Sequence, residues 1–285
     1  MVLSRVFCIG NGESRKVFDL EQLKQHGKIY GCNAIYRDFT PDVLISVDQG
    51  IMHEIYHSGY CHENESWFRD WTKVPAMHYE MMVYAGLTKL EVDELKETYD
   101  SHMENKRINQ QEFVMHGANL SGIANIIKKN KSKGNKVVKE HVNHSHLYVS
   151  WISDEDKSHS IIDIFDDNVD RGWAAGPTSG YIACKKEKPC EVFLIGHDLR
   201  SNNNTVNNLF KGTKHYVTES HKPTPYQNWV IQWDRLFKEF PDIHFYKVNK
   251  KGELGNDNVS CRIDDWNDNK NLFYIDYQTM LDKCE

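Results

Sequence analysis

Short polar side chains stand directly after three buried apolar runs near the start of the chain. They are Asn11, Asn33 and Asp48, which follow the runs 5–9, 28–32 and 42–47. The carboxyl ends of parallel strands meet at one edge of a sheet, so we expect these three side chains to lie together. Amide and carboxylate groups at such an edge suit the bases and hydroxyls of a nucleotide better than they suit core packing.

The loop after the first run has the sequence Gly10-Asn11-Gly12-Glu13-Ser14-Arg15. Its two glycines permit a tight turn and a close approach of the backbone to a ligand, which makes Gly12 a candidate nucleotide contact. The loop is not a dinucleotide-binding fingerprint, because Arg15 stands where the third glycine belongs, and no Gly-Lys-Ser/Thr follows to make a P-loop. An ordinary turn between a strand and a helix is the alternative.

A second group of polar residues lies between positions 176 and 204. Pro177 and Thr178 predict a helix start there. Ser179 and Gly180 then fall among the first N–H groups, which together with the helix dipole form an anion site. Pro189 is expected to end this helix.

The run 190–195 is nearly all apolar, as expected for a parallel strand covered on both faces. His197, Asp198 and Arg200 follow it, where open α/β sheets bind their ligands. The sequence therefore predicts that Asp198 joins the nucleotide site. An ordinary helix–strand unit with a polar loop is the competing interpretation.

Residues 200–222 are polar, rich in asparagine and almost without core residues. A long polar segment after a strand end is typical of an active-site lid, and a surface loop is the alternative. His215 and His221 are its candidate general bases, because histidine titrates near neutral pH. Arg200 is the candidate group for charge developing on a leaving phosphate.

The segment His53–His57 matches the zinc-protease pattern H-E-x-x-H, with Glu54 as the potential base. The expected helix is barely two turns long, and Gly59 and His62 do not fit the longer metzincin pattern. We therefore expect a solvated helix face and no metal. His141, His144 and His146 have metal-like spacing without a nearby fourth ligand, so we expect polar residues at a strand edge.

These residues must be positioned by alternating strands and helices. Besides the four apolar runs, we expect a short helix capped by Asp19, strands at 147–152 and 243–248, and helices at 88–103 and 118–129. The clearest helix has Thr224 as its cap, an aromatic core-facing stripe, and Pro241 at its end. The pattern predicts one Rossmann-like α/β domain over residues 1–285, with a mostly parallel sheet and helices on both faces.

The composition bounds the class of protein. The chain has 285 residues and a net charge of -6, with no basic face for nucleic acid. Its seven cysteines are scattered, which favours a reducing compartment over a disulfide framework. No signal-peptide pattern and no membrane-spanning run is present, so we expect a cytoplasmic protein with no tightly bound cofactor and an oligomeric state that stays open.

Four motifs in this order resemble the bacterial CMP-sialic-acid transferases of lipooligosaccharide synthesis. That family has a G-N-G-P-S turn, a C-N-x-F-Y segment, a T-S-G helix start and a G-x-D strand end. The matching residues are 10–14, 31–36, 178–181 and 193–198. The segment 41–48 is more similar to motility-accessory and pterin diphosphokinase-like proteins, with P-D-x-x-x-S-V-D. The resemblance to the transferases covers about the first 60 residues and residues 176–250. The chain also resembles proteins encoded by tailed phages, and a phage-encoded protein would lie in the host cytoplasm.

The resemblance implies contacts of Asn11, Asn33 and Ser179 with a cytidine nucleotide, and a lid that supplies a histidine base. Arg200 stands where the family has a tyrosine, and Asp48 where it has an asparagine, which leaves the donor sugar open. The implied activity moves a sialic-acid-like sugar from a CMP-linked donor to a hydroxyl acceptor such as a glycan. A pterin-type diphosphokinase and a non-catalytic binding or virion protein are the alternatives.

Overall fold

The structure is a computed structural model that describes residues 4–75, 78, 112–117, 123, 147–151, 156–201, 204–250 and 261–285. The chain forms two compact units, where the sequence led us to expect one domain. The first unit comprises residues 1–46 and 171–285, and the second comprises residues 47–170. The first unit carries most of the predicted site.

The first unit contains six parallel strands in the order β11-β10-β9-β1-β2-β3. Their bounds are β1 Arg5–Ile9, β2 Lys28–Cys32, β3 Val43–Ser46, β9 Glu191–Ile195, β10 His244–Asn249 and β11 Leu272–Asp276. This arrangement confirms the predicted Rossmann-like α/β fold with a mostly parallel sheet. The chain builds outward from β1 toward β3 and from β9 toward β11, so the strand order reverses between β1 and β9.

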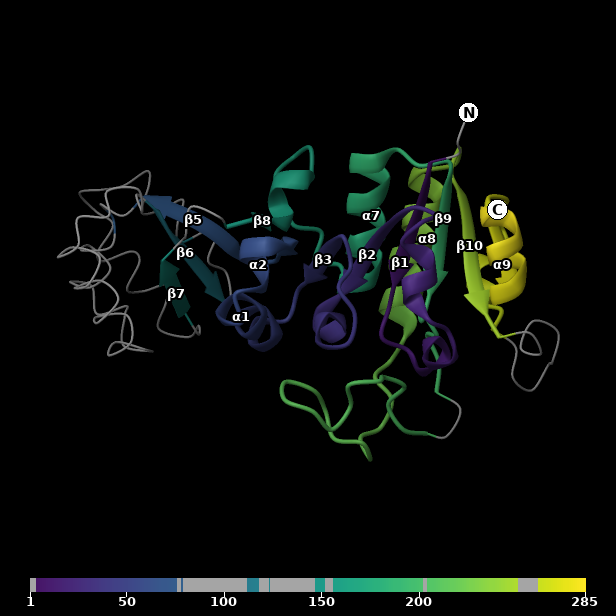
Figure 1. Ribbon diagram of the computed structural model, residues 1–285, viewed down its shortest axis with the longest axis horizontal. Coiled ribbons are helices and arrows are strands. Elements are labelled where there is room, and N and C mark those ends of the chain that lie inside the picture. Colours follow the sequence, from purple (N-terminus) through teal and green to yellow (C-terminus); the bar gives the residue numbers. More distant parts are fainter. Residues whose placement is uncertain are drawn as a thin grey trace. The chain divides into compact units, whose positions relative to one another are not determined.

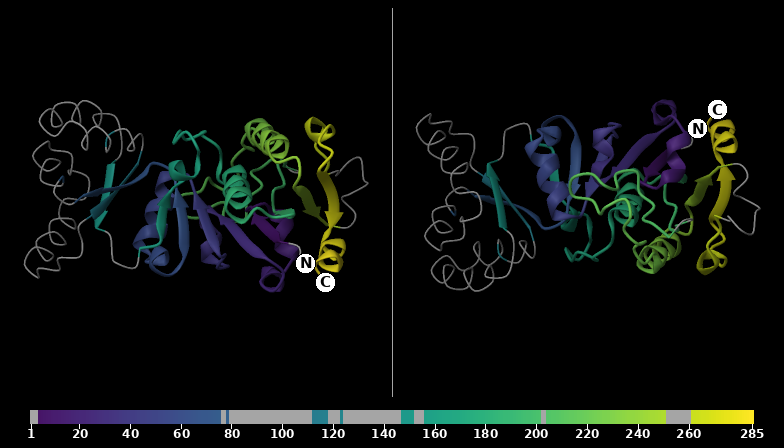
Figure 2. Two further views of the ribbon diagram at one scale, coloured as in Figure 1. Left: turned by 90° about the horizontal axis from the view of Figure 1, so that it is seen from above. Right: turned by 90° about the horizontal axis from the view of Figure 1, so that it is seen from below.

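Helices cover both faces of this sheet (Figures 1 and 2). The views from above and below place α7 and α8 on one face, and α9 on the other. Their bounds are α7 Ala175–Glu187, α8 Gln227–Glu239 and α9 Tyr277–Cys284. Short 3-10 helices lie in the connections between the strands. They are η1 Glu13–Val17 and η2 Leu20–Leu23 after β1, η3 Asn33–Arg37 after β2, and η6 Asp264–Trp266 before β11.

An aromatic ladder crosses four strands on the α9 face. Phe7 stacks on Phe193 at 5.1 Å between ring centroids, Phe193 on Tyr246 at 4.9 Å, and Tyr246 on Phe273 at 5.4 Å. These residues occupy matching register positions in β1, β9, β10 and β11. Lateral stacking of this kind stabilises the sheet beyond the burial of apolar area.

The helix starts differ from the sequence predictions. Helix α7 begins at Ala175, two residues before Pro177, because a proline without an N–H is tolerated throughout the first turn. Helix α8 begins at Gln227 after Tyr226, so Thr224 does not cap it. The short helix at Leu20–Leu23 is capped as predicted, since the Asp19 carboxylate accepts from the N–H of Glu21 at 3.1 Å.

The second unit combines a parallel strand pair with a three-stranded antiparallel sheet. Strand β4 (Glu65–Phe68) pairs with β8 (Ser158–Ser160), and the order of the antiparallel sheet is β5-β6-β7. The remaining bounds are β5 Trp71–Pro75, β6 Glu112–Gly117, β7 Leu147–Trp151, α1 Gln49–His57, α2 Tyr60–Glu63 and η5 Ile161–Ile164. The predicted strand at 147–152 is confirmed over Leu147–Trp151, and Ile152 lies outside the described residues. The predicted helices at 88–103 and 118–129, apart from Ile123, and His141, His144 and His146 lie outside the described residues.

Candidate functional site

The loops after β1 and β9 lie side by side where the strand order reverses. The N–H of Gly10 donates to the carbonyl of Ile195, and the N–H of Gly12 to the carbonyl of Gly196, each at 2.8 Å. Gly196 has a φ of 69°, a left-handed conformation that glycine adopts without strain. In open α/β sheets, the strand-order reversal is where ligands bind.

Asp198 fastens these two loops together. One carboxylate oxygen accepts from the main-chain N–H of Ser14 at 3.0 Å, and the other accepts from the Ser14 hydroxyl. Gly12 makes room for it, since a Cβ there would lie 2.5 Å from Oδ2 of Asp198. Asp198 and Gly12 therefore hold the loops after β1 and β9 against each other. Their predicted contact with a nucleotide stays a prediction.

Asn11 presents a buried hydrogen-bond acceptor at this edge. Its Nδ2 donates to the carbonyl of Cys32 at the end of β2, at 2.9 Å. Its Oδ1 is buried and has no hydrogen-bond partner among the described residues. An acceptor left without a donor costs roughly 1–3 kcal/mol, so a bound molecule that supplies a donor would stabilise this amide.

Asn33 begins η3, directly after β2, with a φ of 51°. Its Oδ1 accepts from the Ser46 hydroxyl at 3.0 Å, which links the ends of β2 and β3. Asn11 and Asn33 are thus brought to neighbouring strand ends as predicted. Asp48 belongs to the second unit, where it immediately precedes α1.

Ser179 and Gly180 lie in the second turn of α7, because the helix begins at Ala175. The Ser179 hydroxyl donates to the carbonyl of Gly176 at 2.6 Å, and Ser179 is fully buried. A Cβ at Gly180 would lie 2.7 Å from the ring of Trp233 on α8. The expectation that these residues offer free N–H groups at a helix start is corrected: both serve the packing of α7.

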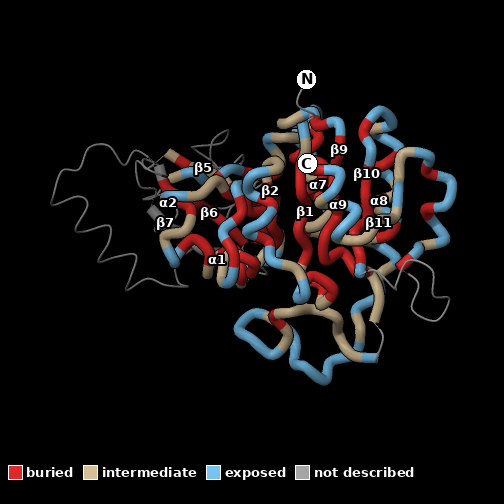
Figure 3. Tube along the Cα trace, turned by 45° about the vertical axis from the view of Figure 1, so that its right-hand side comes forward, coloured by how far each residue is buried: buried red, intermediate tan, exposed pale blue. Residues whose placement is uncertain are grey.

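The described residues of the predicted lid, 200–201 and 204–222, form no helix or strand and lie below the carboxyl ends of the strands (Figure 1). They are mostly exposed or half-buried, apart from Phe210, which is 8% exposed (Figure 3). The N–H of Leu209 donates to the carbonyl of Asn11 at 2.8 Å, and Lys211 pairs with Glu13 at 2.6 Å. The lid therefore closes over the end of β1.

A second set of contacts ties the lid to η3. The Tyr216 hydroxyl accepts from the N–H of Ala34 at 3.3 Å. Arg37 donates to the Thr213 hydroxyl at 2.9 Å and to the carbonyl of Lys214 at 3.1 Å. The segment of the lid that includes His215 is thus held against the end of β2.

The three predicted catalytic residues take different positions. His215 is exposed and has a φ of 66°. His221 is exposed too, with Nδ1 2.6 Å from the carbonyl of Lys222, and its own carbonyl accepts from Val206 at 2.9 Å. Arg200 is half-buried, two residues beyond Asp198. Only His215 lies within the part of the lid held to η3.

The sequence did not single out Arg15 as a site residue. Arg15 is 5% exposed, and its Nη2 lies 3.2 Å from Asp38. Its Nε is buried without a hydrogen-bond partner among the described residues. The one signal in the sequence is its place in the glycine-rich turn after β1, where it also excludes a dinucleotide-binding fingerprint.

His197 and Lys247 form a buried polar pair at the ends of β9 and β10. Burial lowers the pKa of His197 to about 4, with a further lowering by the charge of Lys247. Its Nε2 lies 3.2 Å from the carbonyl of Cys8, and Lys247 donates to Asn249 at 2.8 Å. At neutral pH His197 is therefore uncharged, with Nε2 donating to that carbonyl. The buried position of Lys247 was not foreseen from the sequence.

In the second unit, the H-E-x-x-H residues lie on α1 next to His116 of β6. Nδ1 of His53 is 3.4 Å from Nε2 of His116, and the rings of His53 and His57 are 4.1 Å apart. Burial and the two neighbouring histidines lower the pKa of His116. Within the described part of the chain, no group of three or more histidine, cysteine or carboxylate side chains is arranged to hold a metal ion.

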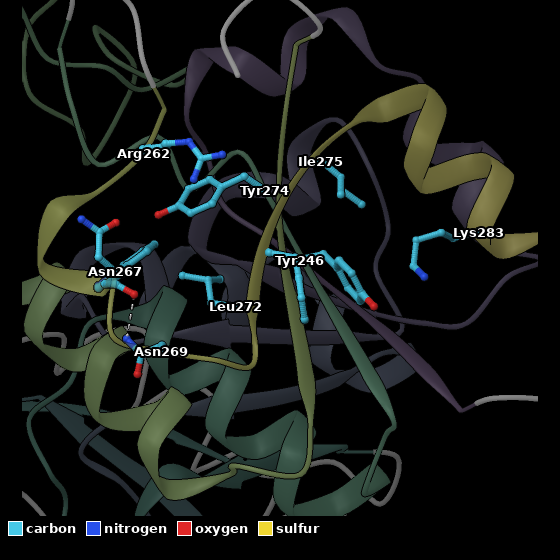
Figure 4. A pocket seen from close by; sticks show the side chains of 10 residues that line it. Tyr246, Arg262, Asn267, Asn269, Leu272, Tyr274, Ile275 and Lys283 are labelled. Atoms are coloured by element: carbon cyan, nitrogen blue, oxygen red, sulfur yellow. Dashed lines mark hydrogen bonds between the residues drawn. The ribbon is translucent and has the colours of Figure 1, made fainter. Parts of the chain in front are cut away.

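A separate hollow of about 520 Å³ lies along the edge strand β11, and no predicted site residue lines it. Figure 4 shows Arg262 and Tyr274 on one side of β11, and Tyr246 and Lys283 on the other. Arg262 lies over Tyr274 at 5.1 Å and Lys283 over Tyr246 at 4.9 Å. Both cations are thus engaged with tyrosine rings of the sheet.

No protein family model, curated protein or solved structure matches this chain at a significant level. Among the described residues, no helix is both long enough and apolar enough to cross a membrane.

Proposed function

We propose that the protein is a glycosyltransferase that moves a sugar from a nucleotide-activated donor to a hydroxyl acceptor. The proposal depends chiefly on one observation: at the strand-order reversal, beneath a polar lid, Asn11 holds a buried acceptor that no described residue satisfies. A nucleoside supplies the N–H or O–H donors that such an acceptor requires. The CMP-linked, sialic-acid-like donor is the finer form of this proposal, and it comes from the family resemblance.

The reaction assigns a task to each group at the site. The acceptor hydroxyl attacks the anomeric carbon, and a base takes its proton. His215 is the preferred base, because its segment of the lid is held against η3 by Arg37 and Tyr216. Arg200 is the proposed partner of the departing phosphate, since a guanidinium stabilises phosphate charge with directed hydrogen bonds.

The contacts of the lid fit this order of events. The lid closes over Asn11 and Glu13 through the hydrogen bond from Leu209 and the ion pair of Lys211, and about half of its described residues are exposed. Such a segment opens at low cost, admits a donor and then excludes water from the reaction. Exclusion of water matters here, because water competes with the acceptor hydroxyl.

A thermal-shift screen over nucleotides and nucleotide sugars is the first test. A saturating ligand raises the melting temperature by mass action, since it binds only the folded protein. We expect a shift with the cognate nucleotide that is weaker in Asn11→Ala and Asn33→Ala. The proposal fails if no nucleotide or nucleotide sugar shifts the melting temperature.

Turnover of the bound donor separates the alternatives. Donor cleavage that accelerates with a glycan or other hydroxyl acceptor supports glycosyl transfer. ATP turnover with release of AMP in the presence of a pterin would replace it with a diphosphokinase. Nucleotide binding without turnover under any acceptor would leave a non-catalytic binding protein.

A further inference from the structure

Arg15 is a buried cation at the centre of the carboxyl edge of the sheet. Only 5% of the residue is exposed. A Cβ on Gly196, at the end of β9, would lie 3.2 Å from its Cδ, and the ring of Phe210 is 5.8 Å from its guanidinium carbon. Its charge also lowers the pKa of Cys32 at the end of β2, although burial keeps that pKa raised overall. Arg15 is thus surrounded by β9, β2 and the lid.

The hydrogen bonds of Arg15 are incomplete. Its carboxylate partner is Asp38, whose side chain is 47% exposed and whose oxygens lie 3.2 and 3.4 Å from Nη2. Nε lies buried without an acceptor among the described residues. A structural arginine would be expected to direct Nε at a carbonyl or carboxylate, since a buried N–H group is rarely left unpaired.

Arg15 and Asn11 share the same surroundings. Asn11 donates to the carbonyl of Cys32, and its own carbonyl accepts from Leu209, the lid residue next to Phe210. One buried donor, Nε of Arg15, and one buried acceptor, Oδ1 of Asn11, therefore lie near two consecutive lid residues with no partner in the described part of the chain. A ligand that completes both must offer an acceptor oxygen as well as an N–H or O–H group, and an anionic oxygen makes the strongest hydrogen bond to a guanidinium.

We propose that Arg15 binds a phosphate of the nucleotide through Nε, while Oδ1 of Asn11 accepts a hydrogen bond from its nucleoside part. This inference rests on the proposed function and adds to it a phosphate-binding residue. The ligand class is a nucleoside phosphate. Leu209 and Phe210 move away to admit the ligand. Arg200 then stabilises the negative charge that develops on the departing phosphate only during transfer.

The phosphate increment, the ratio of the dissociation constant of cytidine to that of CMP, isolates this role. Calorimetry on the full chain measures both ligands, with uridine and UMP and with adenosine and AMP run in parallel. A charge-assisted hydrogen bond contributes about a 10–100-fold preference for the nucleotide. We expect Arg15→Gln to reduce the increment at least tenfold, and Arg15→Lys to reduce it less, because the charge remains.

Three variants separate phosphate binding from folding, lid closure and nucleoside binding. Arg37→Gln removes the other guanidinium near Phe210, which lies 5.9 Å from that ring, and should leave the increment unchanged. Asp38→Asn keeps Arg15 and removes its carboxylate partner, so the increment should be kept or raised. Asn11→Ala should weaken the binding of cytidine and of CMP by similar factors, so the ratio of their dissociation constants should stay the same.

The outcomes distinguish this inference from the proposed function. If the wild-type protein binds no nucleotide, both are wrong. If it binds nucleotides and a folded Arg15→Gln protein keeps the wild-type increment, Arg15 is structural and only this inference fails. If Arg15→Gln does not fold, the phosphate increment of Arg15→Lys is the test. An increment equal to that of the wild-type protein overturns the proposal, and a smaller increment supports it.

Discussion

The hydroxyl of Tyr216 accepts a hydrogen bond from the main-chain N–H of Ala34 at 3.3 Å. Ala34 is the first residue after Asn33 in η3, so its N–H has no acceptor within the helix. A lid side chain thus occupies a helix start at the carboxyl edge of the sheet. The ring of Tyr216 also lies 5.8 Å from that of Phe210, a buried residue of the lid.

Tyr216→Phe tests whether this contact holds the lid closed. The ring contact with Phe210 is kept, and one hydrogen bond of about 0.5–1.5 kcal/mol is lost. We expect hydrogen exchange of the lid amides to accelerate about twofold to tenfold, with little change in melting temperature. Lys222→Gln, at an exposed position, is the matched control. Equal exchange rates in all three proteins would show that the hydroxyl does not stabilise the closed lid.

Gly180→Ala tests the packing role that the structure gives to this glycine. The new methyl group would meet the ring of Trp233 at 2.7 Å, and Trp233 is fully buried. Overpacking of this kind lowers the free energy of unfolding by roughly 1–3 kcal/mol, measurable by urea denaturation. Loss of nucleotide binding with unchanged stability would instead support the nucleotide contact predicted from the sequence.

The pKa of His197 predicts how stability depends on pH. The folded protein holds this pKa at about 4, below the ordinary value of 6.5, because burial disfavours the charged ring. Between these two values the unfolded chain binds a proton that the folded chain does not. Stability contributed by His197 is therefore present above pH 6.5 and is lost as the pH falls through about 4, on the order of 3 kcal/mol in total.

Urea denaturation between pH 7 and pH 4 measures this loss. His116 contributes in the same direction, since its pKa is lowered as well, so the comparison must be made with a variant. We expect the free energy of unfolding of His197→Asn to fall less steeply than that of the wild-type protein over this range. Equal slopes would contradict a neutral, buried His197.

The sequence predicted the central strands well because their apolar runs are continuous. β1 and β2 have the predicted bounds, and β9 differs by one residue. Strand β11 was not predicted, since it lies at the sheet edge and none of its residues is fully buried. An edge strand shows a weaker pattern than a strand covered on both faces.

The role of Arg15 could not be predicted from local sequence. An arginine after a glycine-rich turn is ordinarily solvated, and its burial depends on Gly196 and Phe210, which are remote in the chain. The same holds for Asp198, which was expected to face a ligand. In the structure it accepts hydrogen bonds from Ser14, because the strand order places the β1 and β9 loops together, and local sequence gives no sign of that contact.

The remaining prediction concerns the lid histidines. Attack by a hydroxyl requires a base, and loss of that base costs roughly a hundredfold to ten-thousandfold in turnover with little change in donor affinity. His215 follows Lys214, whose carbonyl is held by Arg37 at 3.1 Å, so its position depends on lid closure. We therefore expect this large loss in His215→Ala.

His221 offers the matched comparison, because its Nδ1 lies 2.6 Å from the carbonyl of Lys222 and its backbone anchors Val206. A histidine engaged in this way stabilises the base of the lid, so His221→Ala should lower turnover only a few-fold, by an order-of-magnitude argument from one lost hydrogen bond. Donor turnover and calorimetric donor binding are measured together on both variants. If both turn over donor like the wild-type protein, the lid histidines are surface residues and the base lies elsewhere. A large loss of turnover in His221→Ala alone would make His221 the base and His215 the structural residue.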